Sequence, residues 1–154
     1  SVVATGGINR WQDDRDVPDT WSVLLDYPES KFHVNYSSYL GSDHFGYGEQ
    51  FCGNDGTIEI SKRQTLNFYP ETYAGVPEYV KARKELSITI PNNDNLAVEA
   101  HIRNFLNSII GVEKPIAPPA AGYEAAIPGF MSVLSYKQGK KVLWDHKADK
   151  YSFA

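Results

Sequence analysis

The sequence contains a single cysteine, Cys52, among its 154 residues. One cysteine cannot form an intrachain disulfide and cannot supply a cysteine-rich zinc site. No apolar run approaches the roughly 18 residues of a membrane span, and the first ten residues lack the basic-then-apolar order of a signal peptide. The cysteine usage leaves the compartment open and favours the cytoplasm, and a periplasmic location would require a signal upstream of Ser1.

Positive charge is also scarce, with 15 lysines and arginines against 19 acidic residues and a net charge of −4. Because a nucleic-acid surface normally carries a basic stripe, we expect no nucleic acid partner and no membrane partner. The length fits a single domain, residues 1–154, that buries a core without metal or disulfide staples. Ten tyrosines and three tryptophans suit sugar pockets, subunit interfaces or simply a half-buried sheet.

The first ninety residues carry strand patterns. Residues 20–27 and 31–39 both alternate apolar and polar side chains, and the four residues 28–31 between the apolar patterns have turn chemistry. A hairpin with Tyr27 opposite Phe32 and Asp26 opposite His33 satisfies both faces. Further strands are expected at 2–8, 47–52, 57–60, 66–69, 86–90 and 142–144, with a turn at 53–56. Residues 70–85 have weak periodicity and are expected to form a loop or irregular insert.

The last sixty residues carry helical patterns. A helix capped by Asp94 or Asn95 is expected to run to about Ile110, with an apolar stripe along one side and Gly111 as a left-handed C-cap. A second helix is expected over 121–138, ended by Gly139, and its Pro128 implies a kink or a late start. Strands followed by helices indicate an α+β fold, with a mostly antiparallel open sheet and helices packed on one face.

Self-sufficient catalytic motifs are missing. No glycine-rich phosphate loop or Gly-x-Ser-x-Gly elbow occurs, and none of the four histidines pairs with another at i, i+4. We therefore expect no metal site and no catalytic or cofactor-binding residue in this chain. Cys52 is interpreted as a small core residue, and His101 as a satisfied histidine at the edge of its helix's apolar stripe.

Two loops carry candidate binding groups. The acidic segment 13–16 is either a polar connector with local Asp–Arg pairing, which we favour, or a carboxylate cluster for catalysis. The loop 42–48 mixes hydrogen-bonding groups, aromatics and glycines, which fits a binding loop on a rigid scaffold and equally fits a glycine-rich connector.

Several segments, in order, resemble the C-terminal domain of the glucose-fructose oxidoreductase, inositol dehydrogenase and rhizopine-catabolism (Gfo/Idh/MocA) family. They are WQDDRDVPDT at 11–20, GEQFCGNDGTIEI at 48–60, HIRNFL at 101–106 followed by KP at 114–115, GYEAA at 122–126, LSY at 134–136, and GKKVLWD at 139–145. Each segment is a weak signal, but their order and spacing agree along most of the chain. The Glu113-Lys114-Pro115 triplet lies between the two helices and is not the family's catalytic motif.

The resemblance implies a dihydrodipicolinate-reductase-like domain, on the substrate side of an NAD(P)-dependent oxidoreductase acting on a sugar, a polyol or a derivative. NAD or NADP would bind an N-terminal Rossmann domain absent from this chain, so the isolated chain is expected to be inactive and to bind neither cofactor. The family also implies homo-oligomer formation through the sheet face. By position, His44 and Tyr47 would contact the carbohydrate-like substrate and Asp43 would accept a hydroxyl, with Arg15 as a further contact.

Two alternatives stay open beside this reading. The domain can be a purely structural assembly module of an inactive family member. It can also belong to a relative that uses bound NAD transiently for glycoside hydrolysis. The missing Rossmann sequence separates active from inactive members, because it would carry the glycine fingerprint and the catalytic lysine.

Overall fold

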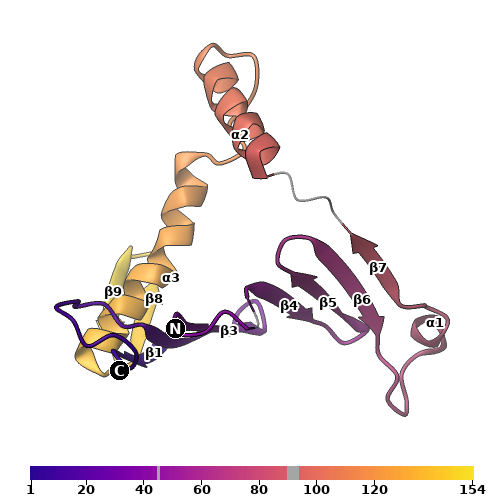
Figure 1. Ribbon diagram of the computed structural model, residues 1–154, viewed down its shortest axis with the longest axis horizontal. Coiled ribbons are helices and arrows are strands. Elements are labelled where there is room, and N and C mark those ends of the chain that lie inside the picture. Colours follow the sequence, from indigo (N-terminus) through magenta and orange to yellow (C-terminus); the bar gives the residue numbers. More distant parts are fainter. Residues whose placement is uncertain (45, 90–93) are drawn as a thin grey trace. The chain divides into compact units, whose positions relative to one another are not determined.

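The computed structural model of the chain describes residues 1–44, 46–89 and 94–154, and the chain divides into two compact units (Figure 1). The terminal unit comprises Ser1–Asp43 and Pro115–Ala154, and the central unit comprises His44–Lys114. Helices and antiparallel sheets occur together, which confirms the predicted α+β class. The expectation of one open sheet is wrong for the described residues, because their strands form two sheets, one in each unit.

The terminal unit is built on a five-stranded sheet with the strand order β3-β2-β1-β8-β9. The strands are β1 (Val2–Gly7), β2 (Thr20–Tyr27), β3 (Phe32–Tyr39), β8 (Val142–Asp145) and β9 (Lys150–Phe153), and all pairings are antiparallel. The sequence reading missed β9. The turn before it is stabilised by Asp145, whose Oδ1 accepts hydrogen bonds from the backbone N–H groups of Lys147 and Ala148.

The β2–β3 hairpin has the register predicted from its alternation. Tyr27 pairs with Phe32 and Asp26 pairs with His33, and the Tyr27 and Phe32 rings stack with centroids 4.7 Å apart. Lys31 takes the left-handed backbone conformation in the turn. The observed pairing confirms the predicted register, in which both apolar sets lie on the same face.

Helix α3 (Pro119–Gln138) covers one face of this sheet, against β1 and β8. Its start at Pro119 lies two residues before the predicted one, because proline is well suited to a first helical turn, and a late start at Pro128 is wrong. Gly139 ends the helix in the left-handed conformation, as predicted. The core between helix and sheet consists of Val2, Val23, Met131 and Val142, with partly buried Trp21 packed edge-to-face on Tyr136.

The central unit is built on a four-stranded antiparallel meander, β4-β5-β6-β7. Its strands are β4 (Gly48–Cys52), β5 (Gly56–Ser61), β6 (Thr65–Pro70) and β7 (Leu86–Thr89). The turn at 53–56 is confirmed by the backbone hydrogen bond from Gly53 N–H to the Gly56 carbonyl. The predicted end of the last strand, at residue 90, lies outside the described residues.

The segment 70–85, expected to be a loop or irregular insert, contains a short helix, α1 (Glu78–Lys81). Val80 within this helix and Val76 just before it are both buried, which explains the order of the segment despite its weak periodicity. Helix α2 (Asp94–Ile109) ends one residue earlier than predicted, and Gly111 after it has φ +77°, as expected for a left-handed cap. The predicted cap by Asp94 or Asn95 concerns side chains outside the described ones.

The exit from α2 is fixed by a buried amide. Asn104 Nδ2 donates to Glu113 Oε2 at 2.9 Å and to the Lys114 carbonyl at 3.0 Å, and Asn107 Nδ2 donates to Glu113 Oε1. These bonds fold residues 110–114 back against the last turns of the helix. The Glu113-Lys114-Pro115 triplet thus contributes its first side chain and its second carbonyl to the contacts that fix this exit.

Candidate functional site

A buried carboxylate organises the β1–β2 loop, residues 8–19. The oxygens of Asp19 accept hydrogen bonds from the backbone N–H groups of Asn9, Arg10 and Trp11 at 2.8–3.1 Å, and from the Thr20 hydroxyl at 3.0 Å. Burial by itself raises the pKa of Asp19, but these donors outweigh burial and lower the pKa to about 2. The loop backbone is therefore fixed by an ionised side chain at its C-terminal end.

Arg15 is held on the same loop by two neighbours. Its Nε and Nη2 donate to the two carboxylate oxygens of Asp13, each at 2.7 Å, and its guanidinium carbon lies 4.7 Å from the centroid of the Trp11 ring. The side-chain hydrogen bonds from Arg15 lower the pKa of Asp13 to about 2. The predicted local Asp–Arg pairing in the segment 13–16 is thereby confirmed.

The loop between β3 and β4 carries the other predicted site residues. Asp43 and His44 are exposed, and the boundary between the two units falls between them in the sequence. The Tyr47 hydroxyl donates to the Lys62 carbonyl at 3.2 Å, and the Arg63 guanidinium lies 5.3 Å from the Tyr47 ring centroid. Tyr47 is therefore packed on the β5–β6 turn.

The structure divides the four predicted substrate contacts between the two units. Arg15 and Asp43 belong to the terminal unit, while His44 and Tyr47 belong to the central unit. Arg15 contacts Asp13 and Trp11, and Tyr47 contacts the β5–β6 turn. Their role as substrate contacts stays a prediction for all four residues.

The central sheet has one polar and one apolar face. The register places Phe51 opposite Ile58 and Ile58 opposite Phe68, and Phe68 lies opposite Leu86. Period-two alternation puts these residues on one face, and 59% of Phe51 and 51% of Leu86 remain accessible to solvent. The apolar face of the β4–β7 sheet is thus open over much of its area.

A shallow pocket lies at the β4–β5 turn, at the end of the central sheet. It is lined by Phe51, Cys52, Gly53, Asn54, Asp55, Gly56, Ile58, Phe68 and Arg83. The polar rim is braced by Tyr79, whose hydroxyl donates to Asp55 Oδ2 at 2.9 Å and whose ring lies 5.5 Å from the Arg83 guanidinium carbon. The hydrogen bond to Asp55 raises the pKa of Tyr79. The pocket combines an aromatic floor with charged groups at its edge.

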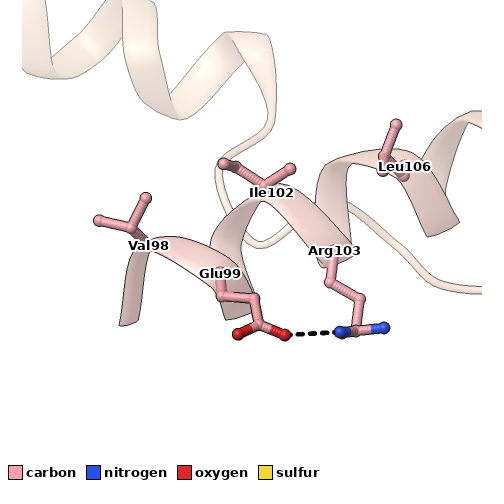
Figure 2. Close-up of a pocket in the computed structure, with 5 residues that line it drawn as sticks. All are labelled: Val98, Glu99, Ile102, Arg103 and Leu106. Atoms are coloured by element: carbon pink, nitrogen blue, oxygen red, sulfur yellow. Dashed lines mark hydrogen bonds and ion pairs between the residues drawn. The ribbon is translucent and has the colours of Figure 1, made fainter. Parts of the chain in front are cut away.

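Helix α2 carries a second shallow surface, shown in Figure 2. Val98, Ile102 and Leu106 project from one side of the helix, and Glu99 and Arg103 form an ion pair at 2.7 Å beside them. The apolar stripe predicted from the helical spacing is confirmed, and its side chains are more than half exposed. Its chemistry suits packing against another apolar surface.

The structure tests the sequence interpretations of Cys52 and His33. Cys52 is an exposed free thiol, so its interpretation as a small core residue is wrong. Alternation along β4 turns Cys52 away from the face that carries Phe51. His33 lies opposite Asp26, as expected. Within residues 1–44, 46–89 and 94–154, no group of three metal-ligating side chains gathers, and no helix there has the length and apolar character needed to cross a membrane.

Sequence reasoning missed two parts of the β1–β2 loop. It gave no role to Trp11, and it did not identify Asp19 as a buried anchor. The available signal was an aspartate in a loop, since Asp side chains often accept hydrogen bonds from backbone N–H groups. That signal does not reveal burial, which depends on how the loop folds back over β2.

No protein-family model matches the chain, and no curated protein matches it either.

Proposed function

We propose that this chain is the substrate-side and oligomerisation domain of an NAD(P)-dependent oxidoreductase that acts on a sugar, a polyol or a derivative. The observation that carries the proposal is the open apolar face of the β4–β7 sheet. Phe51, Leu86 and Ile88 on that face are each 45–59% exposed, and contiguous apolar surface of this kind marks interaction sites. The ordered resemblance to the Gfo/Idh/MocA family supplies the chemical context.

In this proposal, a Rossmann domain outside the chain holds NAD or NADP and supplies the hydride chemistry. The present chain contributes loops to the substrate pocket and a face to the assembly. The carbohydrate-like substrate would contact His44, Tyr47, Asp43 and Arg15. The isolated chain would neither bind the dinucleotide nor turn over a substrate.

The assembly role is tested by light scattering after gel filtration. We expect the chain to form a dimer or larger homo-oligomer, and we expect Phe51→Glu to shift it to the monomer by placing a charge on the apolar face. Cys52→Glu is the matched control, because it adds the same charge one residue along β4 on the opposite face. A monomeric parent chain, or equal masses for the two variants, would contradict assembly through this face.

The cofactor role is tested separately by titrating the chain with NADH and recording nicotinamide fluorescence. The proposal expects no saturable change. Tight NADH binding by this chain would overturn it, because the dinucleotide site would then lie here and not in a separate domain.

The exposed β4–β7 face equally suits an inactive family member that serves only in assembly. An NAD-dependent glycosidase would also use the same domain. The Rossmann sequence and an assay for hydride transfer against glycoside cleavage distinguish these alternatives from the oxidoreductase.

A further inference from the structure

We propose that a second copy of this chain covers the apolar face of the β4–β7 sheet with its helix α2, and that the contact is reciprocal, so that two copies close into a dimer. This pairing rests on the assembly role proposed above and deepens it by naming the surface that the sheet meets. A sheet-to-sheet contact would leave α2 exposed, whereas a helix-on-sheet contact covers both apolar surfaces of each copy.

Helix α2 carries an exposed apolar stripe, three of whose side chains are shown in Figure 2. The α2 stripe consists of Val98, Ile102, Phe105, Leu106 and Ile109, which recur at helical spacing and are 54–67% exposed. A helix in a folded protein gains most of its stability by packing such a stripe against another apolar surface. The α2 stripe is therefore a docking surface.

The β4–β7 sheet offers an apolar surface of similar length. Phe51, Ile58, Phe68 and Leu86 lie opposite one another in a row across the four strands. Neighbouring strands lie about 4.8 Å apart, so this row spans about 14 Å. The α2 stripe rises about 17 Å over its length, at about 1.5 Å per residue. One helix is thus long enough to cover the row.

A second copy fits both surfaces because every copy carries both of them. A single chain leaves the α2 stripe and the apolar sheet face largely open to solvent. When two copies meet about a twofold axis, the helix of each covers the sheet of the other, and one encounter forms two identical contacts. A one-way contact would leave a free sheet and a free helix, and it would grow into open chains.

Opposite charges border both surfaces. Glu99 and Arg103 form an ion pair at 2.7 Å beside the α2 stripe, and Asp55 and Arg83 line the pocket to which Phe51 also contributes. Glu99 of one copy can therefore meet Arg83 of the other. Arg103 can meet Asp55 in the same docking. Charge pairs at the rim of an interface mainly fix its register and orientation.

Complementation between two variants tests the pairing by light scattering after gel filtration. Phe51→Glu damages the sheet face and leaves α2 intact, while Ile102→Glu damages the α2 stripe and leaves the sheet intact. Each added charge occurs in both contacts of a twofold dimer, so each variant alone should raise the dimer Kd about a hundredfold or more and elute as a monomer. An equimolar mixture should form dimers where neither variant does alone, because the mixed pair keeps one undamaged contact.

The control for the helix variant is Ala100→Glu. Ala100 is exposed on the side of α2 opposite Ile102, so this variant should keep the parent mass. Leu86→Glu and Leu106→Glu repeat the two kinds of damage at other positions. They replace any variant whose circular dichroism spectrum shows that it has lost its fold.

The outcomes separate this pairing from the assembly role on which it rests. If Phe51→Glu is monomeric but Ile102→Glu keeps the parent mass, the sheet face meets something other than α2, so the pairing is overturned and the assembly role stands. A mixture that stays monomeric also overturns the pairing, because α2 and the sheet are then not partners across the dimer. A monomeric parent chain, or Phe51→Glu at the parent mass, contradicts the assembly role itself.

Discussion

The hydroxyl of Ser135 is predicted to be a main contributor to the stability of the terminal unit. Ser135 is 1% exposed, and its Oγ accepts the N–H of Ala4 at 2.9 Å and donates to the Lys140 carbonyl at 2.7 Å. Continuing the antiparallel register from the Val2–Val142 pair places Ala4 opposite Lys140. The hydroxyl therefore bridges β1 to the start of β8 where a direct ladder bond would otherwise form.

Ser135→Ala removes both hydrogen bonds and leaves the Ala4 N–H without its acceptor. An unsatisfied buried donor costs about 1–3 kcal/mol, while Lys140 is exposed, so its carbonyl can recover a bond from water. We expect a loss of about 2 kcal/mol in the free energy of unfolding. For a chain of this size that corresponds to a fall in Tm of about 4–8 °C.

The control for this prediction is Ser132→Ala, one helical turn earlier on α3. The Ser132 hydroxyl donates to the Pro128 carbonyl four residues back in the same helix, a bond that bridges no other element and often weakens a helix slightly. Both variants gain the same helix propensity from alanine, so that gain cancels in the comparison. Thermal unfolding by circular dichroism, with hydrogen exchange at the Ala4 amide, measures the difference. Equal Tm values and unchanged Ala4 protection would refute the bridging role.

Three further predictions concern the terminal unit. The pKa of Asp19 is lowered from 3.8 to about 2, so its ionised form should stabilise the fold above about pH 4 and lose this effect as the pH falls towards 2. In urea unfolding, the free energy of unfolding of Asp19→Asn should therefore differ most from that of the parent at neutral pH. A difference that does not change with pH would contradict this. Gly139→Ala should cost about 1 kcal/mol of stability because φ is +61° there. Gly122→Ala, whose added Cβ has no atom within 4 Å, should be neutral or stabilise the helix by up to about 1 kcal/mol. Chemical denaturation that ranks the two variants the other way would exclude this account. Met131→Ala should cost about 2–5 kcal/mol, because the side chain is 4% exposed in the core, and a loss below 1 kcal/mol would show that the core closes over the cavity.

Local patterns predicted the regular elements well. The alternation around Tyr27 and Phe32 determined both the hairpin and its register, because a slip of one residue would turn every apolar side chain to the other face. The stripe of α2 and the left-handed glycines at 111 and 139 were likewise readable, since helical spacing and positive φ have direct residue signatures. These features depend only on neighbours in sequence.

Features that depend on distant partners were not readable. The division of the strands into two sheets depends on which edges meet, and the sequence carries no signal for that choice. The short helix around Val80 was missed because burial by surrounding chain, and not periodicity, stabilises it. The anchoring role of Asp19 and the packing of Arg15 on Trp11 arise from the folded loop. The composition of the segment 13–16 indicated only a polar connector with local Asp–Arg pairing or a carboxylate cluster.

The arrangement of β1 has a consequence for how the chain folds during synthesis. β1 pairs with β2 on one side and with β8 on the other, so the terminal unit joins segments more than 100 residues apart, while the central meander uses only adjacent strands. Local contacts form fast, and long-range ones must wait for their partners to emerge from the ribosome. The central unit can therefore fold during translation, whereas the core of the terminal unit closes only when α3 and β8 have been made, and until then the apolar face of β1 and β2 stays uncovered.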